Sequence, residues 1–292
     1  MNPSLRTAAL FLVLTGIFVA FGWIIGTVFF GDWVMAVISF LLLAAAMNAI
    51  AYFFADKFVL LTYRARIVTE AEAPDLYRAV SRVALASGLP TPRIAIVPSQ
   101  TPNAFATGRN PKHAVVAVTQ GMLRVLNERE LGAVIAHEMA HIKDRDILVM
   151  SIAATIAGAL TLLARWAFWG TLFSGRRDRD SGLLYIVAIL SLILVPIAVL
   201  AIQMTISRSR EFKADYIGAK TINEPGALAD ALEQLEYRNR RSPMQFGSPT
   251  TASLWIVNPF REGRFVGLFS SHPRIEARVE KLRKLAHGID TY

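Results

Sequence analysis

Four long apolar segments constrain the fold of this chain more than any other feature of its sequence. The first two cover residues 7–30 and 33–55, and only Gly31 and Asp32 separate them. Each is long enough to cross a bilayer as a helix, and longer than the apolar core of a cleaved signal peptide. Residues 147–164 and 182–206 form two further apolar segments. We therefore expect four transmembrane helices arranged as two hairpins.

Basic residues beside these segments predict their orientation. Arg6 precedes the first segment and Lys57 follows the second, whereas the turn between them contains neither lysine nor arginine. By the positive-inside rule, the N-terminus and the region after the first hairpin face the cytoplasm. The second hairpin conflicts with this rule, because its connecting loop contains Arg176, Arg177 and Arg179. We expect this hairpin to cross the membrane. The alternative is a hairpin that is partly buried against protein.

The composition indicates a membrane surface as the partner of the basic residues. The net charge is +9, and 54% of the residues are hydrophobic. Lysines and arginines gather around the apolar segments, so anionic lipid headgroups are the expected partner. No basic stripe interleaved with aromatic residues is evident, and nucleic-acid binding is therefore not expected. The sequence contains no cysteine, so a metal site must use histidine and carboxylate ligands.

The remaining sequence has the pattern of a mainly helical domain with a small sheet. Apolar spacing predicts an amphipathic helix over residues 72–87 that ends at Gly88. Residues 93–97 and 114–119 are predicted strands, with a turn-rich connection at residues 101–108. These strands either belong to a sheet that only packs on helices, or one of them is an edge strand that pairs with an extended peptide. The pattern alone does not choose between the two.

Domain boundaries follow from these segments. We predict an N-terminal transmembrane hairpin at residues 1–56 and a first part of the soluble domain at residues 57–146. A second hairpin then covers residues 147–206, and the second part of the soluble domain covers residues 207–292. In that last part, residues 238–253 are rich in Arg, Ser, Pro and Gly and are predicted to form a long loop.

A predicted helix over residues 127–142 begins with Asn127 and Glu130, which fit a capping box. It contains the motif His-Glu-x-x-His. His137 and His141 are four residues apart, so they lie on one helix face and can bind one zinc ion. Glu138 lies about 100° around the helix from His137. It can therefore stay off the metal and act as a general base on water beside it. Because the chain has only five histidines, a chance occurrence of this motif is improbable.

A catalytic zinc ion needs a third protein ligand, and Glu211 is the best candidate. It lies on a predicted helix, and Asp215 follows four residues later on the same face. Asp215 is placed to accept the second ring N–H of a ligating histidine. The alternative is that both are surface acids paired with neighbouring basic residues. A two-span hairpin favours the ligand role, because it returns the chain to the membrane face where His141 lies.

The chain resembles the HtpX-type integral membrane zinc metalloproteases, which are related to the CAAX prenyl endopeptidases. The resemblance covers essentially the full length and rests on several short segments. These are Asn103-Ala-Phe-Ala, His137-Glu-Met-Ala-His141, the Arg-Asp-Ile-Leu that ends at Leu148, Ser209-Arg-Glu-Phe-Lys-Ala-Asp215, and Ser271-His-Pro273 with Arg278.

This resemblance implies the roles of the remaining site residues. Glu211 is implied as the third zinc ligand, with Asp215 behind the ligands. Asn103 is implied to lie on the substrate-binding edge and to hydrogen-bond the peptide backbone. His272 and Arg278 are implied to line the cleft, with His272 steadying the oxyanion as a catalytic residue.

The resulting expectation is an α+β membrane protein with a zincin-type protease domain and one Zn²⁺ per chain. It would hydrolyse peptide bonds of misfolded or surplus membrane proteins, as quality control in the bacterial inner membrane, with its protease domain in the cytoplasm. One alternative is an inactive scaffold with a structural zinc, although such sites usually have four protein ligands. A transporter is a weaker alternative, because the apolar segments contain almost no ionisable residues.

Overall fold

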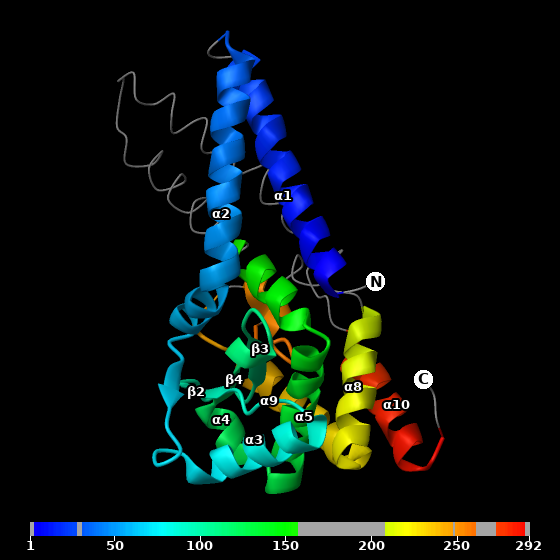
Figure 1. The fold of residues 1–292 in the computed structure, drawn as a ribbon. Coiled ribbons are helices and arrows are strands. Elements are labelled where there is room, and N and C mark those ends of the chain that lie inside the picture. The colour runs from blue at the N-terminus through cyan, green and yellow to red at the C-terminus, as the bar shows by residue number, and fades with distance from the viewer. Residues whose placement is uncertain (1–2, 28–30, 157–207, 248, 261–272, 290–292) are drawn as a thin grey trace.

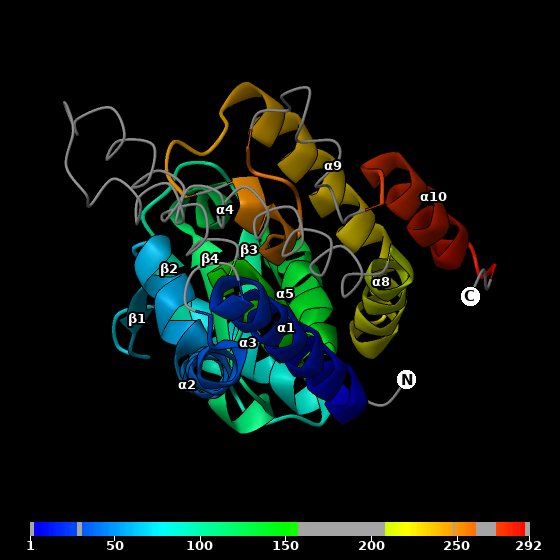
Figure 2. The ribbon, with the colours of Figure 1, turned by 90° about the horizontal axis from the view of Figure 1, so that it is seen from above.

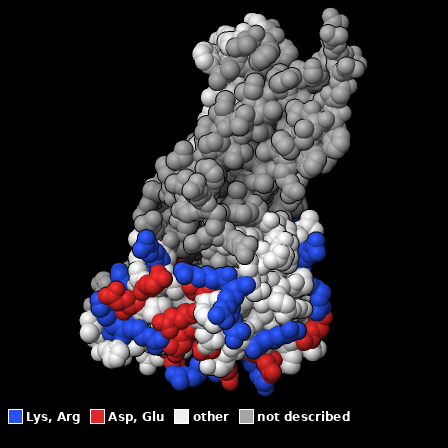
Figure 3. Space-filling model, turned by 180° about the vertical axis from the view of Figure 1, so that it is seen from behind, with Lys and Arg blue, Asp and Glu red and all other residues white. Residues whose placement is uncertain are grey.

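In a computed structural model of the chain, a long helical hairpin stands on a compact α+β domain (Figure 1). The structure describes residues 3–27, 31–156, 208–247, 249–260 and 273–289. Helices α1 (Pro3–Ile25) and α2 (Trp33–Thr62) form the hairpin. Lysine and arginine alternate with aspartate and glutamate over the face of the domain shown in Figure 3.

Four transmembrane helices are not confirmed. Within the described residues, α2 is long and apolar enough to cross a membrane, whereas the apolar part of α1, Thr7–Trp23, is shorter. Of the third predicted segment, the structure describes the beginning, within an apolar helix at Asp146–Ile156. The fourth predicted segment, residues 182–206, lies outside the described residues.

Small and polar residues hold α1 and α2 together. A Cβ atom on Gly22 would lie 2.9 Å from the Cβ atom of Phe40, so glycine allows the helices to approach closely. The amide Nδ2 of Asn48 donates to Oγ1 of Thr15 on the facing helix, over 3.0 Å. Asp32 begins α2 by accepting hydrogen bonds from two backbone amides of its first turn.

A four-stranded mixed sheet forms the centre of the domain, in the order β1-β2-β4-β3. The strands are β1 (Arg66–Val68), β2 (Arg93–Val97), β3 (Ala104–Thr107) and β4 (Val115–Thr119). Strands β2 and β4 are parallel, and the other two pairs are antiparallel. The predictions of β2 and β4 are confirmed, but the prediction that residues 101–108 are only a connection is wrong because β3 lies within them. Strands β2 and β4 are inner strands, so the idea that one of them is an edge is also wrong.

Helix α5 (Glu128–Lys143) lies at the centre of the helical layer. The predicted capping box is present at its start, between Asn127 and Glu130. Helix α5 contacts α3 (Pro74–Ser87), α8 (Arg208–Ile222), α9 (Pro225–Arg241) and β3. The described residues also form α4 (Gln120–Val125), α10 (Ile275–Ala286) and the 3₁₀ turns Pro111–His113 and Pro249–Leu254. Helix α9 runs to Arg241, so the predicted loop begins later than residue 238.

Both faces of the sheet are buried, which explains its apolar strands. Ile94 and Val116 belong to the main core with α3, α5 and α9. Alternate residues such as Ala95 and Ala117 pack in a second core with Tyr63 from the end of α2. A third cluster joins the hairpin to the helix Asp146–Ile156, which directly follows α5. Figure 2, which looks along α2, shows α8, α9 and α10 to one side of the hairpin.

Candidate metal site

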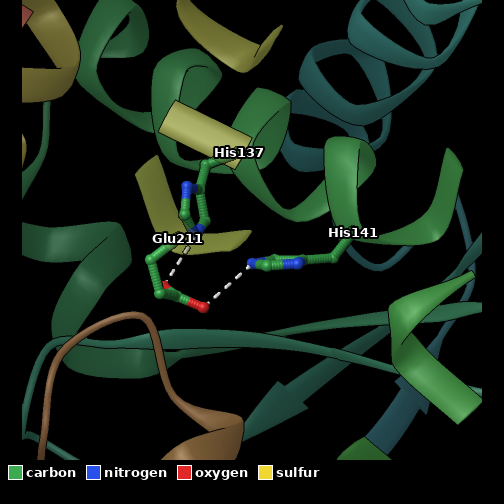
Figure 4. Close-up of side chains that lie close together, drawn as sticks. All are labelled: His137, His141 and Glu211. Carbon is green, nitrogen blue, oxygen red and sulfur yellow. Dashed lines mark ion pairs between the residues drawn. The ribbon is translucent and has the colours of Figure 1, made fainter. Parts of the chain in front are cut away.

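Two helices bring three predicted ligands together inside the domain (Figure 4). Helix α5 supplies His137 and His141, and α8 supplies Glu211; all three side chains are buried. Nε2 of His137 lies 3.7 Å from Oε2 of Glu211, and Nε2 of His141 lies 3.5 Å from Oε1 of the same carboxylate. The packing of α5 against α8 thus brings together His141 and Glu211, which are 70 positions apart along the chain (211 minus 141).

The geometry fits a zinc ion. The ligand atoms of the three residues all lie within 4.8 Å of one another. A tetrahedral zinc ion with bonds of about 2.1 Å places its ligand atoms roughly 3.4 Å apart, close to the two measured separations. Within the described part of the chain, no fourth side chain joins this group. Two histidines and a glutamate with one position left open are a donor set of catalytic zinc sites.

Asp215 and Arg278 lie behind His137. Oδ1 of Asp215 is 2.9 Å from Nδ1 of His137. Arg278, on α10, donates from Nε and Nη2 to the two oxygens of Asp215, over 2.8 and 2.7 Å. Burial would raise the pKa of Asp215, but the charge and hydrogen bonds of Arg278 outweigh it and lower that pKa. Arg278 is fully buried in this arrangement, beside the ligand set.

A second acid lies behind His141. It belongs to the Arg-Asp-Ile-Leu segment that ends at Leu148, but the sequence had assigned it no role in the site. Oδ2 of Asp146 is 3.6 Å from Nδ1 of His141, and Arg210 donates from Nη1 to Oδ1 of Asp146 over 2.8 Å. Each histidine therefore has a carboxylate near Nδ1, and each carboxylate is paired with an arginine. The available signal was an acid just past the end of the motif helix, five residues after His141. One other acid, Asp144, and two bases, Lys143 and Arg145, lie in the same short segment, so the pattern did not single it out.

Glu138 lies beside the edge strand and is buried. Burial is the largest influence on its pKa and raises it to about 7, while a hydrogen bond from the backbone of Ala106 in β3 works in the opposite direction. Burial also lowers the pKa of His137 to about 4. For His141, the lowering by burial is outweighed by Asp146 and the other nearby carboxylates, which raise its pKa to about 9. A carboxyl with a pKa near neutrality is suited to accept and return a proton.

Asn103 precedes β3, one of the two edge strands, and its side chain bonds the chain's own backbone. It is fully buried, and its Nδ2 donates to the carbonyl oxygen of Val257 over 2.6 Å. The neighbouring Ile256 donates its backbone N–H to the carbonyl oxygen of Ala104 over 3.1 Å. Arg278 also donates to the carbonyl oxygen of Ile256, over 2.8 Å. Residues 255–257, hereafter segment 255–257, therefore pair with the start of the β3 edge. His272 lies outside the described residues.

Comparisons with known proteins agree on one family. The sequence model of peptidase family M48 matches residues 70–286. A protein named Protease HtpX homolog, from Thermococcus kodakarensis, is 53% identical over 289 residues, which are 99% of this chain and 98% of the relative. Another of that name, from Syntrophobacter fumaroxidans, is 47% identical over 98% of this chain and 100% of the relative.

A solved structure shares the fold. The crystal structure of S. mikatae Ste24p aligns with a TM-score of 0.51 and 18% identity, over 96% of this chain and 65% of the Ste24p chain. At this identity the likeness concerns the fold alone. The residues matched by the M48 family include every side chain of the metal site described above, and an inactive scaffold receives no support from these comparisons. The chain therefore belongs to peptidase family M48 and is a membrane-bound metalloprotease of the HtpX type.

Proposed function

We propose that this protease cleaves peptide bonds at a single zinc centre formed by His137, His141 and Glu211. The observation that carries the proposal is the meeting of these three buried side chains, with Glu138 beside them. When bound there, zinc would act as a Lewis acid, which would polarise the substrate carbonyl and lower the pKa of a water molecule to about 7. Asp215 with Arg278, and Asp146 with Arg210, orient the two imidazoles from behind.

Glu138 is the proposed general base. It takes a proton from the attacking water and passes it to the leaving amine. Its place next to the ligands and its raised pKa support this role. His272 is proposed to steady the developing oxyanion, an assignment that rests on the resemblance of the Ser271-His-Pro273 segment to the family.

The substrate is proposed to add an extended strand beside β3. The backbone N–H of Ala106 contacts Glu138, and the carbonyl oxygen of Ala104 accepts a hydrogen bond from Ile256. The backbone N–H and C=O groups of the even-numbered residues of β3 therefore point away from β4. A peptide paired with this side of β3 passes close to Glu138. Backbone pairing of this kind makes selection loose in sequence. Asn103 is the proposed contact at the start of this edge, but it is fully buried and bonded to Val257, so a peptide can reach it only if segment 255–257 moves away from the edge.

We further propose that the substrates are misfolded or surplus membrane proteins. The third apolar cluster packs the hairpin against the helix that follows α5, which supports a metal site near the end of the domain that carries the hairpin. The proposed location is the inner membrane of a bacterium, with the domain on the cytoplasmic side, and the proposed domains are those predicted from sequence. The basic residues beside the apolar segments support this orientation.

Replacement of Glu138 tests the proposed chemistry. We expect Glu138→Gln to retain one zinc ion per chain, measured by elemental analysis of the purified protein, and to abolish cleavage of an unfolded membrane protein. Glu128→Gln is the matched control, because Glu128 lies on the exposed first turn of the same helix and should retain full activity. Continued cleavage by a clean Glu138→Gln preparation would refute the mechanism.

A further inference from the structure

The turn between β3 and β4 lies at the base of the hairpin (Figure 1). The guanidinium carbon of Arg109, in this turn, is 5.6 Å from the ring centroid of Phe53 on α2. Phe53 belongs to the apolar segment 33–55 and lies two residues before its end, which is about 3 Å along the helix axis. A turn at this level reaches the boundary between the hydrocarbon core and the headgroups.

The turn, residues 108–113, has the composition of a membrane-interface element. It contains Arg109 and Lys112 and no acidic residue. On the same part of α2, Phe53, Phe54 and Phe58 are 52%, 44% and 47% exposed. Exposed aromatic rings and basic side chains gather at membrane–water interfaces.

Nearby charges leave this cationic character in place. The ammonium group of Lys57 lies 4.9 Å from the ring centroid of Phe54 and adds a further positive charge on α2. The acid of the same helix end, Asp56, is bonded to Arg93 over 2.9 Å. Lys112 and His113 are exposed, and Arg109 is partly exposed.

The backbone of the turn is held in one shape. Gly108 has φ +131°, and a Cβ atom there would lie 2.4 Å from the carbonyl oxygen of His113. Oδ1 of Asn110 accepts the backbone N–H of His113 over 3.1 Å. At the end of β3, the hydroxyl groups of Thr107 and Ser151 are 2.7 Å apart, which joins the strand to the helix Asp146–Ile156. The basic side chains are therefore presented from a fixed scaffold.

We propose that the β3–β4 turn binds the headgroup phosphates of anionic phospholipids through Arg109 and Lys112. This contact holds β3 at a set height below the bilayer. Ala106, which contacts Glu138, is three residues from Arg109, or about 10 Å along an extended strand. A consequence that rests on the proposed function is that cleavage falls within the first few residues after a substrate's membrane span.

Lipid-specific quenching in nanodiscs tests the contact on the zinc-free full chain. Because the chain has no cysteine, a fluorophore can be placed uniquely at Pro111→Cys in the turn, or at Ala86→Cys, an exposed position of α3. We expect headgroup spin-labelled phosphatidylglycerol to quench the label at 111 and not at 86. Equal quenching at both positions, or none at 111, would overturn the proposal.

Charge substitutions test the residues that carry it. Each basic residue near an anionic surface favours anionic over zwitterionic lipid by about fivefold. With two such residues, labelled phosphatidylglycerol should quench the fluorophore at position 111 at concentrations about 25-fold below those of labelled phosphatidylcholine. Arg109→Gln with Lys112→Gln should remove this preference. Arg78→Gln with Arg82→Gln, the same charge change on exposed side chains of α3, should leave it intact. An unchanged preference in the Arg109 and Lys112 variant would overturn the assignment.

The zinc-loaded protein then tests the consequence separately. Single-span substrates with a uniform unfolded cytoplasmic segment should be cut within about six residues of the span, and the Arg109 and Lys112 variant should cut over a wider range. Cuts scattered along the segment by the unmodified protein would contradict the height argument. Absence of cleavage by the zinc-loaded unmodified protein would contradict the proposed function, whereas the quenching result would stand independently.

Discussion

At the scale of single residues, His137 is held at both ring nitrogens. Nε2 faces Glu211, and Nδ1 faces Asp215, whose two oxygens are bonded by Arg278. The ring therefore keeps one orientation before any metal arrives. A carboxylate that accepts from a ligating imidazole also makes the other nitrogen a better donor to the metal.

Replacing Arg278 should weaken zinc binding. Arg278→Gln leaves the buried carboxylate of Asp215 without its charge partner, and breaking a buried ion pair costs about 3–5 kcal/mol. We expect a lower free energy of unfolding and a zinc affinity reduced about 10–100-fold, measured by competition with a chromogenic chelator. Arg278→Lys should recover only part of the affinity, because lysine cannot donate to both oxygens. Wild-type affinity in both variants would show that Arg278 has no positioning role.

Asp146 should act in the same way on His141. We expect Asp146→Asn to reduce zinc affinity about 10-fold or more, because the carboxylate near Nδ1 is lost. Asp144→Asn is the matched control: Asp144 lies two residues before Asp146, and its carboxylate pairs with Lys213 instead of a histidine. The same chelator competition compares the two. Equal affinities in the two variants would argue against a specific role for Asp146.

At the scale of elements, the site depends on how closely α8 approaches α5. Glu211, Asp215 and Gly218 follow one another at spacings of four and three, so they share one face of α8. A Cβ atom on Gly218 would lie 2.8 Å from the backbone nitrogen of His137 and 2.9 Å from its Cα atom. These are backbone atoms that cannot rotate away. Glycine at this position allows Glu211 and Asp215 of α8 to reach His137.

Gly218→Ala should therefore separate the two helices and reduce zinc affinity. Relief of the clash moves α8 outward, which lengthens the 2.9 Å contact between Asp215 and His137. Gly132→Ala on α5 is the control, because no atom lies within 4 Å of the added Cβ, and alanine favours a helix by roughly 0.5–1 kcal/mol over glycine. Chelator competition and thermal unfolding of the metal-free proteins distinguish the cases. Zinc affinity in Gly218→Ala equal to that of Gly132→Ala would contradict the argument.

At the scale of the whole molecule, the hairpin and the domain share packed clusters. The third cluster contains Leu14 of α1 and Ala55 of α2 together with Val149 and Ile152 of the helix after α5. Tyr63, just after α2, packs edge-on against Trp255, so segment 255–257 is also connected to the hairpin. The hairpin of α1 and α2 is therefore part of the support of the catalytic domain.

Labelling can test the predicted path of residues 147–206. We expect a cysteine at Asp178→Cys to react with a membrane-impermeant thiol reagent added outside the cell, because both flanking segments are predicted to cross. A cysteine at Ala86→Cys, an exposed position of α3, is the reference for the cytoplasmic side, where the domain is proposed to lie. Labelling of residue 178 from the cytoplasmic side alone would instead support a hairpin buried against protein.

Much of the helical framework was predictable from local patterns. Helix α3 ends at Gly88, which adopts φ +68° as expected of a helix C-cap, and α5 begins with the expected capping box. These features depend on residues within one turn of each other. Strand β3 was not predictable in this way, because four residues between Asn103 and Gly108 have little strand preference until β4 supplies their hydrogen bonds.

The sequence by itself determined the zinc helix, because the spacing of His137 and His141 on an α-helix leaves their rings little choice of direction. It also determined the apolar segments and, through several separated motifs, the family. Only the tertiary structure decided that Asp146 stands behind His141, that Gly218 sets the distance between α5 and α8, and that segment 255–257 pairs with the edge of β3. Each of these contacts joins residues that local spacing does not relate, so they exist only once the helices and the sheet have packed.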